Sequence, residues 1–163
     1  MSLPPEIKPN QSVPLLKALH ILTRDGKLNQ DSRRKLKQVY HLVNFIEPLL
    51  KDVLTKQENP TIVDHGAGKS YLGFILYDLL LKQLPQGQVI GIETRGELVE
   101  KSKALAEECG FERMIFEHLS VADSMVSPKL PEKVDIVTAL HACNTATDDA
   151  IQFGLKKQAQ YMV

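Results

Sequence analysis

The sequence predicts an α/β protein in which strands alternate with helices and pair into a parallel sheet. From residue 58 onward, short runs rich in β-branched residues alternate with longer segments whose apolar residues recur at helical spacing. The run Val134–Leu140 is apolar almost throughout, as expected for a parallel strand that is buried on both faces. This β-α-β order implies right-handed crossovers between neighbouring strands.

The chain is expected to have two parts, with an extended segment and helical leader at residues 1–57 and the α/β core at residues 58–163. Pro48 should kink or divide the longer helix of the leader, because proline removes one helical hydrogen bond. The elements expected in the leader are an extended segment at Met1–Val13, a short helix at Leu15–Leu22 and a long amphipathic helix or helix pair from Asp31 to Val53.

In the core, proline and glycine residues separate the segments with strand or helix periodicity. The expected strands are Thr61–Asp64, Gln88–Glu93, Met114–His118 and Val134–Leu140, and the expected helices are Ser70–Leu84, Gly96–Cys109 and Thr147–Gln160. A loop is expected at Leu119–Asp123. The last residues, Ala159–Val163, resemble the first part of a fifth strand, so the chain is expected to be truncated there.

The connection between the first strand and its helix has the pattern of a nucleotide-cofactor loop. The strand ends in Asp64, and a Gly-x-Gly turn follows at Gly66, Ala67 and Gly68. Glycines permit a tight turn and place no side chain between the main-chain N–H groups and a ligand. The helix that begins near Ser70 should direct the positive end of its dipole at that ligand.

A second cofactor feature ends the next strand. Glu93 follows the loop at roughly the spacing of about 20 residues at which an acid holds ribose hydroxyls. A carboxylate offers two acceptor oxygens, so Glu93 should accept from both hydroxyls.

Other cofactor loops fit the same segment less well. The run Gly68-Lys69-Ser70 imitates the end of a phosphate-binding P-loop, but that motif requires glycine where Val63 stands. A dinucleotide site favours a third glycine where Tyr71 stands, which weakens an NAD site without excluding it.

From about Asn59 to the C-terminus, the chain resembles the class I S-adenosylmethionine-dependent methyltransferases. Asp64, Gly66 and Gly68 match the first motif of that family, and Glu93 matches its ribose-binding acid. The segment Ala139–Ala150, with its Leu-His-Ala-Cys run, is similar to a little-characterised branch. The resemblance implies a Rossmann-like, doubly wound sheet with the donor across the C-terminal ends of its strands. Here that methyltransferase fold would be C-terminally incomplete, and the activity of the fragment stays open.

Further roles follow from this resemblance. Asp64 is expected to accept from the ammonium of the donor, and Ser120, Val121 and Asp123 are candidates to contact adenine. A helix N-cap or turn is the competing interpretation of Asp123.

Catalytic residues are less clearly marked. His141 follows the fourth strand, where an imidazole can act as a base or form a hydrogen-bonded pocket wall. Cys143 is a candidate nucleophile, but a lone cysteine is more often a small buried apolar residue. Thr145, Thr147, Asp148 and Asp149 are interpreted as helix-capping residues.

Composition places the chain among ordinary intracellular domains. With 163 residues, 43% of them hydrophobic, the chain can bury one core. Its net charge is zero, so the overall charge of the chain does not attract it to nucleic acid or to a membrane. The two cysteines suggest neither a disulfide framework nor a metal site, and the N-terminus has no secretory signal. We therefore expect a cytoplasmic location, no metal and no membrane partner.

The acceptor is not identified by the sequence. A cationic cluster on the leader, formed by Arg33, Arg34, Lys35 and Lys37, suggests contact with an RNA backbone, although such a run is more often a solvated helix face. The alternative function is a non-catalytic Rossmann-like scaffold that acts through the leader.

Overall fold

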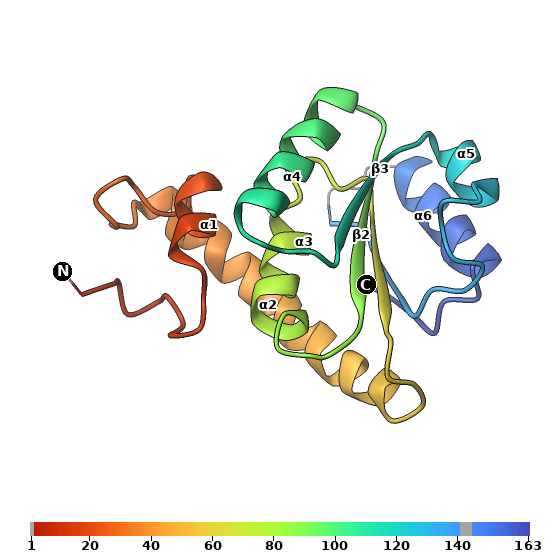
Figure 1. Ribbon diagram of the computed structural model, residues 1–163, viewed down its shortest axis with the longest axis horizontal. Coiled ribbons are helices and arrows are strands. Elements are labelled where there is room, and N and C mark those ends of the chain that lie inside the picture. The colour runs from red at the N-terminus through yellow and green to blue at the C-terminus, as the bar shows by residue number, and fades with distance from the viewer. Residues whose placement is uncertain (1, 141–144) are drawn as a thin grey trace.

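The computed structural model describes residues 2–140 and 145–163 (Figure 1). His141 and Cys143 lie outside these ranges, so their predicted roles have no structural counterpart here. Within the described residues, the strands form one five-stranded sheet with the order β3-β2-β1-β4-β5. All recorded strand pairs are parallel, which confirms the predicted α/β class.

The strand bounds follow the sequence predictions closely in the first half of the core. The strands are β1 (Thr61–His65), β2 (Gln88–Glu93), β3 (Met114–His118), β4 (Ile136–Thr138) and β5 (Tyr161–Met162). Thus β4 is shorter than the predicted strand at Val134–Leu140, and the expected fifth strand pairs beside it. In the sheet, Asp64 lies opposite Gly91 of β2 and Thr138 of β4.

Helices cover both faces of the sheet. The helices are α1 (Val13–Ala18), α2 (Gln30–Leu54), α3 (Tyr71–Leu76), the π-helix η1 (Tyr77–Leu81), α4 (Gly96–Glu108), α5 (Val121–Val126) and α6 (Thr145–Lys156). Figure 1 shows α1 to α4 on one face and α5 and α6 on the other.

The long leader helix α2 is continuous through Pro48, so this residue does not divide the helix, and the alternative outcome, a kink at Pro48, stays a prediction. Pro48 cannot donate to the carbonyl of Asn44, one turn earlier. Asn44 is exposed, and water can therefore hydrogen-bond the freed carbonyl.

The predicted single helix at Ser70–Leu84 is instead two elements, because the chain widens into η1 after Leu76. The N–H of Lys82 bonds the carbonyl of Tyr77, five residues earlier, as in a π-turn. Asp78 in this turn is fully buried, and its carboxylate accepts from the main-chain N–H of Ser12 (2.9 Å) and from Lys82 Nζ (2.6 Å). The π-turn therefore contacts the segment that precedes α1.

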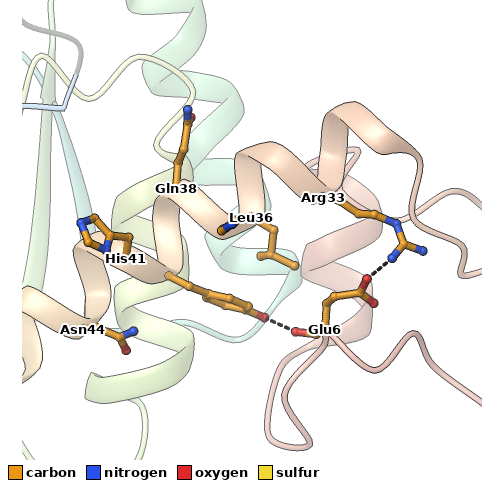
Figure 2. Close-up of a pocket in the computed structure, with 8 residues that line it drawn as sticks. Glu6, Arg33, Leu36, Gln38, His41 and Asn44 are labelled. Atoms are coloured by element: carbon orange, nitrogen blue, oxygen red, sulfur yellow. Dashed lines mark hydrogen bonds and ion pairs between the residues drawn. The ribbon is translucent and has the colours of Figure 1, made fainter.

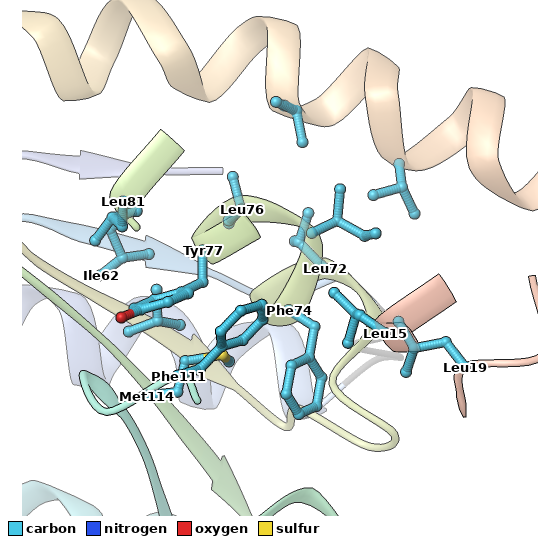
Figure 3. Packing of buried hydrophobic residues seen from close by; sticks show 14 of the residues in the cluster. Leu15, Leu19, Ile62, Leu72, Phe74, Leu76, Tyr77, Leu81, Phe111 and Met114 are labelled. Carbon is cyan, nitrogen blue, oxygen red and sulfur yellow. The ribbon is translucent and has the colours of Figure 1, made fainter. Parts of the chain in front are cut away.

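One apolar core joins the leader to the α/β part of the chain. Leu15 and Leu19, at α1, lie beside Leu72 and Phe74 of α3 in this core (Figure 3). Phe111 packs against Tyr77 with ring centroids 4.7 Å apart. The leader thus covers the side of α3 that does not face the sheet. Within the described residues, no helix has the length and apolar character needed to cross a membrane.

Candidate functional site

The loop between β1 and α3 forms the bare turn predicted from its glycines. Gly66 and Gly68 have φ of 70° and 59°, in the left-handed region where glycine carries no steric cost. A Cβ placed on Gly66 would meet nothing within 4 Å, so the turn faces open space. The main-chain N–H of Ala67 was expected to face a ligand but donates to the carbonyl of Ile92 instead (2.9 Å).

Glu93, at the end of β2, lies directly beside this turn. Its Oε2 accepts from the main-chain N–H of Gly68 at 2.7 Å. Its Oε1 accepts from both the main-chain N–H and Nε of Arg95, at 3.1 and 2.9 Å. The carboxylate that is predicted to hold ribose hydroxyls is therefore close to the loop, and its acceptor sites are partly used by Arg95.

These hydrogen-bond donors stabilise the negative charge of Glu93. Burial raises its pKa, but the hydrogen bonds from Arg95 and Gly68 outweigh burial and hold the pKa below its usual range. The pKa of Arg95 is raised by the same partner. Glu93 is therefore an anion at neutral pH, able to accept hydrogen bonds only.

Asp64 is the second carboxylate of the site, and it lies deeper. Only 3% of the residue is exposed, and Oδ1 accepts from the hydroxyl of Thr138 on β4 at 2.9 Å. Burial raises the pKa of Asp64 to about 7; the negative charge of Glu93 adds to this, and the Thr138 hydrogen bond opposes it. The two acids thus differ in protonation near neutral pH.

Two cavities meet at Gly66, at the C-terminal ends of the strands. The larger, of about 390 Å³, includes Asp64, the loop residues and Arg95 in its wall. The smaller, of about 160 Å³, is bounded by His65, Thr94 and Val121, among others. They lie at the carboxyl end of β1, the strand beside which the strand order reverses toward β4, and ligands of open α/β sheets bind at such a reversal.

Of the three residues predicted to contact adenine, Val121 lies in a cavity wall, whereas Ser120 and Asp123 bond to each other. Val121 lines the smaller cavity. The segment predicted as a loop becomes helix α5 at Val121, because Ser120 caps it: Ser120 Oγ accepts from the N–H of Asp123 (3.1 Å) and donates to its carboxylate (2.8 Å). The two polar side chains therefore satisfy each other, and their contact with adenine stays a prediction.

Sequence reasoning did not single out His65 or Arg95. His65 is 6% exposed, lines the smaller cavity, and has its Nε2 3.5 Å from Ser124 Oγ. Burial lowers its pKa, although the charge of Asp149 opposes this. His65 directly follows Asp64, a predicted site residue, and that adjacency was the available signal for His65; Arg95 is separated from Glu93 by Thr94.

Another cavity, of about 710 Å³, lies away from this loop, between α2 and the segment before α1. Figure 2 shows Arg33 turned toward Glu6, with which it forms an ion pair, while His41 and Asn44 line the same hollow. Lys35 forms a second, exposed pair with Asp31 at 3.7 Å. The leader cluster predicted to contact RNA is thus partly neutralised within the chain.

The fold and the loop identify the class of protein. Residues 34–163 match the family model described as a methyltransferase domain, and the chain belongs to this family.

The chain is also similar to part of two longer proteins. The chain is 29% identical over 142 residues to a glutathione S-transferase C-terminal domain-containing protein of Bos taurus, and 28% identical over 141 residues to the one of Homo sapiens. Each match covers 85% of this chain and 20% of the relative, so the chain spans about a fifth of the length of these proteins.

A solved structure of geranyl diphosphate methyltransferase, in complex with GPP and sinefungin, has the same fold. The TM-score is 0.57 at 14% identity, over 81% of this chain and 43% of that one.

Proposed function

We propose that this chain binds S-adenosylmethionine in the two cavities that meet at Gly66 and donates its methyl group to an acceptor. The observation that carries the proposal is the bare turn at Gly66 and Gly68, hydrogen-bonded through Gly68 to an ionised Glu93. The family match and the methyltransferase fold of the solved relative, whose structure holds sinefungin, support it.

The residues around the turn fit such a donor. Because Gly66 has no side chain, the turn leaves room for the adenosyl group. The lone pairs of Glu93 that are not already used can accept hydrogen bonds from the ribose hydroxyls. Asp64 lies in the wall of the larger cavity, where its carboxylate can accept from the donor's ammonium. Thr94 and Val121 flank the smaller cavity, which suits a flat purine.

The donor supplies a methyl group on a positively charged sulfur. An acceptor lone pair forms a bond to the methyl carbon while the carbon–sulfur bond breaks, and sulfur leaves as a neutral thioether. This displacement depends mainly on alignment, so the chain needs to position two ligands and exclude water. His141 remains our candidate for the base that takes an acceptor proton.

Isothermal titration calorimetry with S-adenosylmethionine and with S-adenosylhomocysteine tests the proposal. We expect both to bind at micromolar levels, and Glu93→Ala to abolish binding without unfolding the chain. NAD and ATP, the ligands of the competing loop interpretations, should give no heat. A scaffold without donor function would bind none of the four.

For the acceptor, we propose RNA that contacts the leader cluster. Arg34 and Lys37 are exposed and take part in no ion pair among the described residues, so they are available to phosphates. Filter binding of bulk RNA to the wild type and to an Arg34→Glu, Lys37→Glu variant tests this contact, and equal retention of RNA by the two proteins would contradict it.

A further inference from the structure

Besides the two cavities that meet at Gly66, of which we call the larger the donor cavity, a third cavity adjoins this region on the face of the sheet that α1 to α4 cover. It has a volume of about 210 Å³ and is bounded by the end of α1, the start of α3 and one side of α4. Its floor is apolar, while His20, Lys69 and Lys101 contribute polar groups to its wall. These three residues are far apart in the sequence, and the fold brings them together from the end of α1, the donor loop and α4.

This third cavity adjoins the donor cavity. Lys69, Tyr71 and Leu98 line both hollows, so one wall separates them. A chain-like ligand that occupies the third cavity therefore reaches the donor cavity by passing Tyr71. We call the two hollows together, with Tyr71 between them, the Tyr71 trough.

The leader contributes charge to the same trough. Lys35 of α2 places its Nζ 5.9 Å from the centroid of the Tyr71 ring. The end of α1 is held to α2, because the hydroxyl of Ser32 donates to the carbonyl of His20 at 3.2 Å. The predicted cationic cluster is thus connected to the donor cavity through Lys35.

The local balance of charge favours an anion. Lys69 and Lys101 appear in no ion pair in the part of the chain that the structure describes. Two nearby acids are already engaged: Glu93 by Arg95 and Gly68, and Glu100 of α4 by Lys103 at 3.6 Å. Lys69 and Lys101 therefore line the hollow without an ion-pair partner among the described residues, and Lys35, which is paired with Asp31, lies over the ring of Tyr71.

We infer that the Tyr71 trough binds a single-stranded polynucleotide, with phosphates at Lys35, Lys69 and Lys101 and a base on the ring of Tyr71. A hollow of about 210 Å³ admits one nucleotide and is too small for a duplex. Stacking on an aromatic ring beside a cationic groove is the usual mode of single-strand binding. This inference rests on the proposed function, since it delivers the acceptor to the donor cavity.

Two positions on α4 provide a matched test. Lys101 lines the trough, whereas Lys103, two residues later, is exposed and paired with Glu100. Lys101→Glu and Lys103→Glu make the same charge change on one helix, and neither residue lines the donor cavity. Binding of a fluorescein-labelled 20-nucleotide RNA is measured by anisotropy at several salt concentrations, with a DNA strand of the same sequence and an RNA duplex alongside.

We expect Lys101→Glu to weaken binding of the single strand by at least about threefold, and to lower the salt slope by about 0.7. Lys103→Glu should bind like the wild type, and the duplex should bind more weakly than the strand. If RNA and DNA bind with equal affinity, the protein recognises the phosphates and bases of the strand. If RNA binds more tightly, the protein also contacts the 2′-hydroxyl groups.

Equal effects of the two variants, or no binding of any strand, would overturn the inference. Tighter binding of the duplex would also overturn it. Calorimetry with S-adenosylmethionine on the same proteins separates this result from the proposed function: donor binding without strand binding contradicts only the trough, whereas absence of donor binding in the wild type contradicts the donor site.

Discussion

The main-chain N–H of Gly68 donates to Oε2 of Glu93 across 2.7 Å, and this bond joins two residues that are 25 positions apart. It connects the loop after β1 to the carboxylate that ends β2. Because neighbouring parallel strands end at the same edge of a sheet, the turn and the acid lie side by side. We therefore expect a ligand bound at the turn to lie within reach of Glu93.

Gly66→Ala is expected to weaken donor binding at least tenfold. The new methyl group would meet no protein atom within 4 Å, so its main obstacle is a ligand in the open space. Gly110 is a matched control, because it has the same φ of 70° and equally open surroundings after α4. Both variants should lose about 1 to 2 kcal/mol of stability from the left-handed backbone. Calorimetry then compares their donor affinities, and equal affinities would exclude a ligand at Gly66.

Arg95→Ala is expected to tighten the binding of adenosine several-fold. The side chain of Arg95 occupies Oε1 of Glu93, and a ribose that takes both oxygens has to displace it. Removing the guanidinium removes that cost and leaves the main-chain N–H bond in place. Measuring the dissociation constant of adenosine for the wild type and the variant, at low and high salt, tests this expectation. Weaker binding to the variant would mean that Arg95 contacts the ligand itself.

Donor affinity is expected to fall as pH decreases below about 7. Burial raises the pKa of Asp64 to about 7, so its carboxyl becomes protonated and neutral below that pH. A neutral carboxyl no longer attracts the donor's ammonium, and the loss approaches tenfold per pH unit when binding requires one deprotonated group. Calorimetry from pH 5.5 to 7.5 measures the slope. Asp64→Asn should bind weakly with little slope, and an unchanged slope in this variant would assign the titration to another group.

Much of the fold followed from local sequence pattern. The bounds of β2 and β3 were predicted to the residue, since each is a short segment with apolar residues between clear breaks. The proximity of Glu93 to the glycine turn also followed, because a parallel β-α-β unit brings those strand ends together. A resemblance to methyltransferases and the family match agree over most of the chain.

Features that depend on distant contacts were not predicted. Nothing near Glu93 in sequence indicated that Arg95 would fold back onto its carboxylate rather than extend into solvent. The π-turn at η1 coincides with a bond from Ser12 to Asp78, 66 positions away, which no local rule contains. The cavity beside Lys101 likewise depends on three elements whose packing becomes visible only in the folded chain.

Asp78→Ala is expected to lower the free energy of unfolding by about 3 to 5 kcal/mol, because it leaves buried donors unpaired. Asp78 is fully buried, and it links the N–H of Ser12 to Lys82, whose Nζ also donates to the carbonyl of Asn10 (2.8 Å). Glu100→Ala removes an exposed pair with Lys103 and should change stability little.

Urea unfolding of the two variants tests the size of this effect, and limited proteolysis tests its location. If Asp78 anchors the segment before α1 to η1, its loss should expose that segment to protease at urea concentrations too low to unfold the sheet. Because α1 also borders the Tyr71 trough, the same variant should bind single-stranded RNA less tightly while its donor affinity is retained. Equal stability and equal protease resistance of the Asp78→Ala and Glu100→Ala proteins would show that the apolar core alone holds the leader in place.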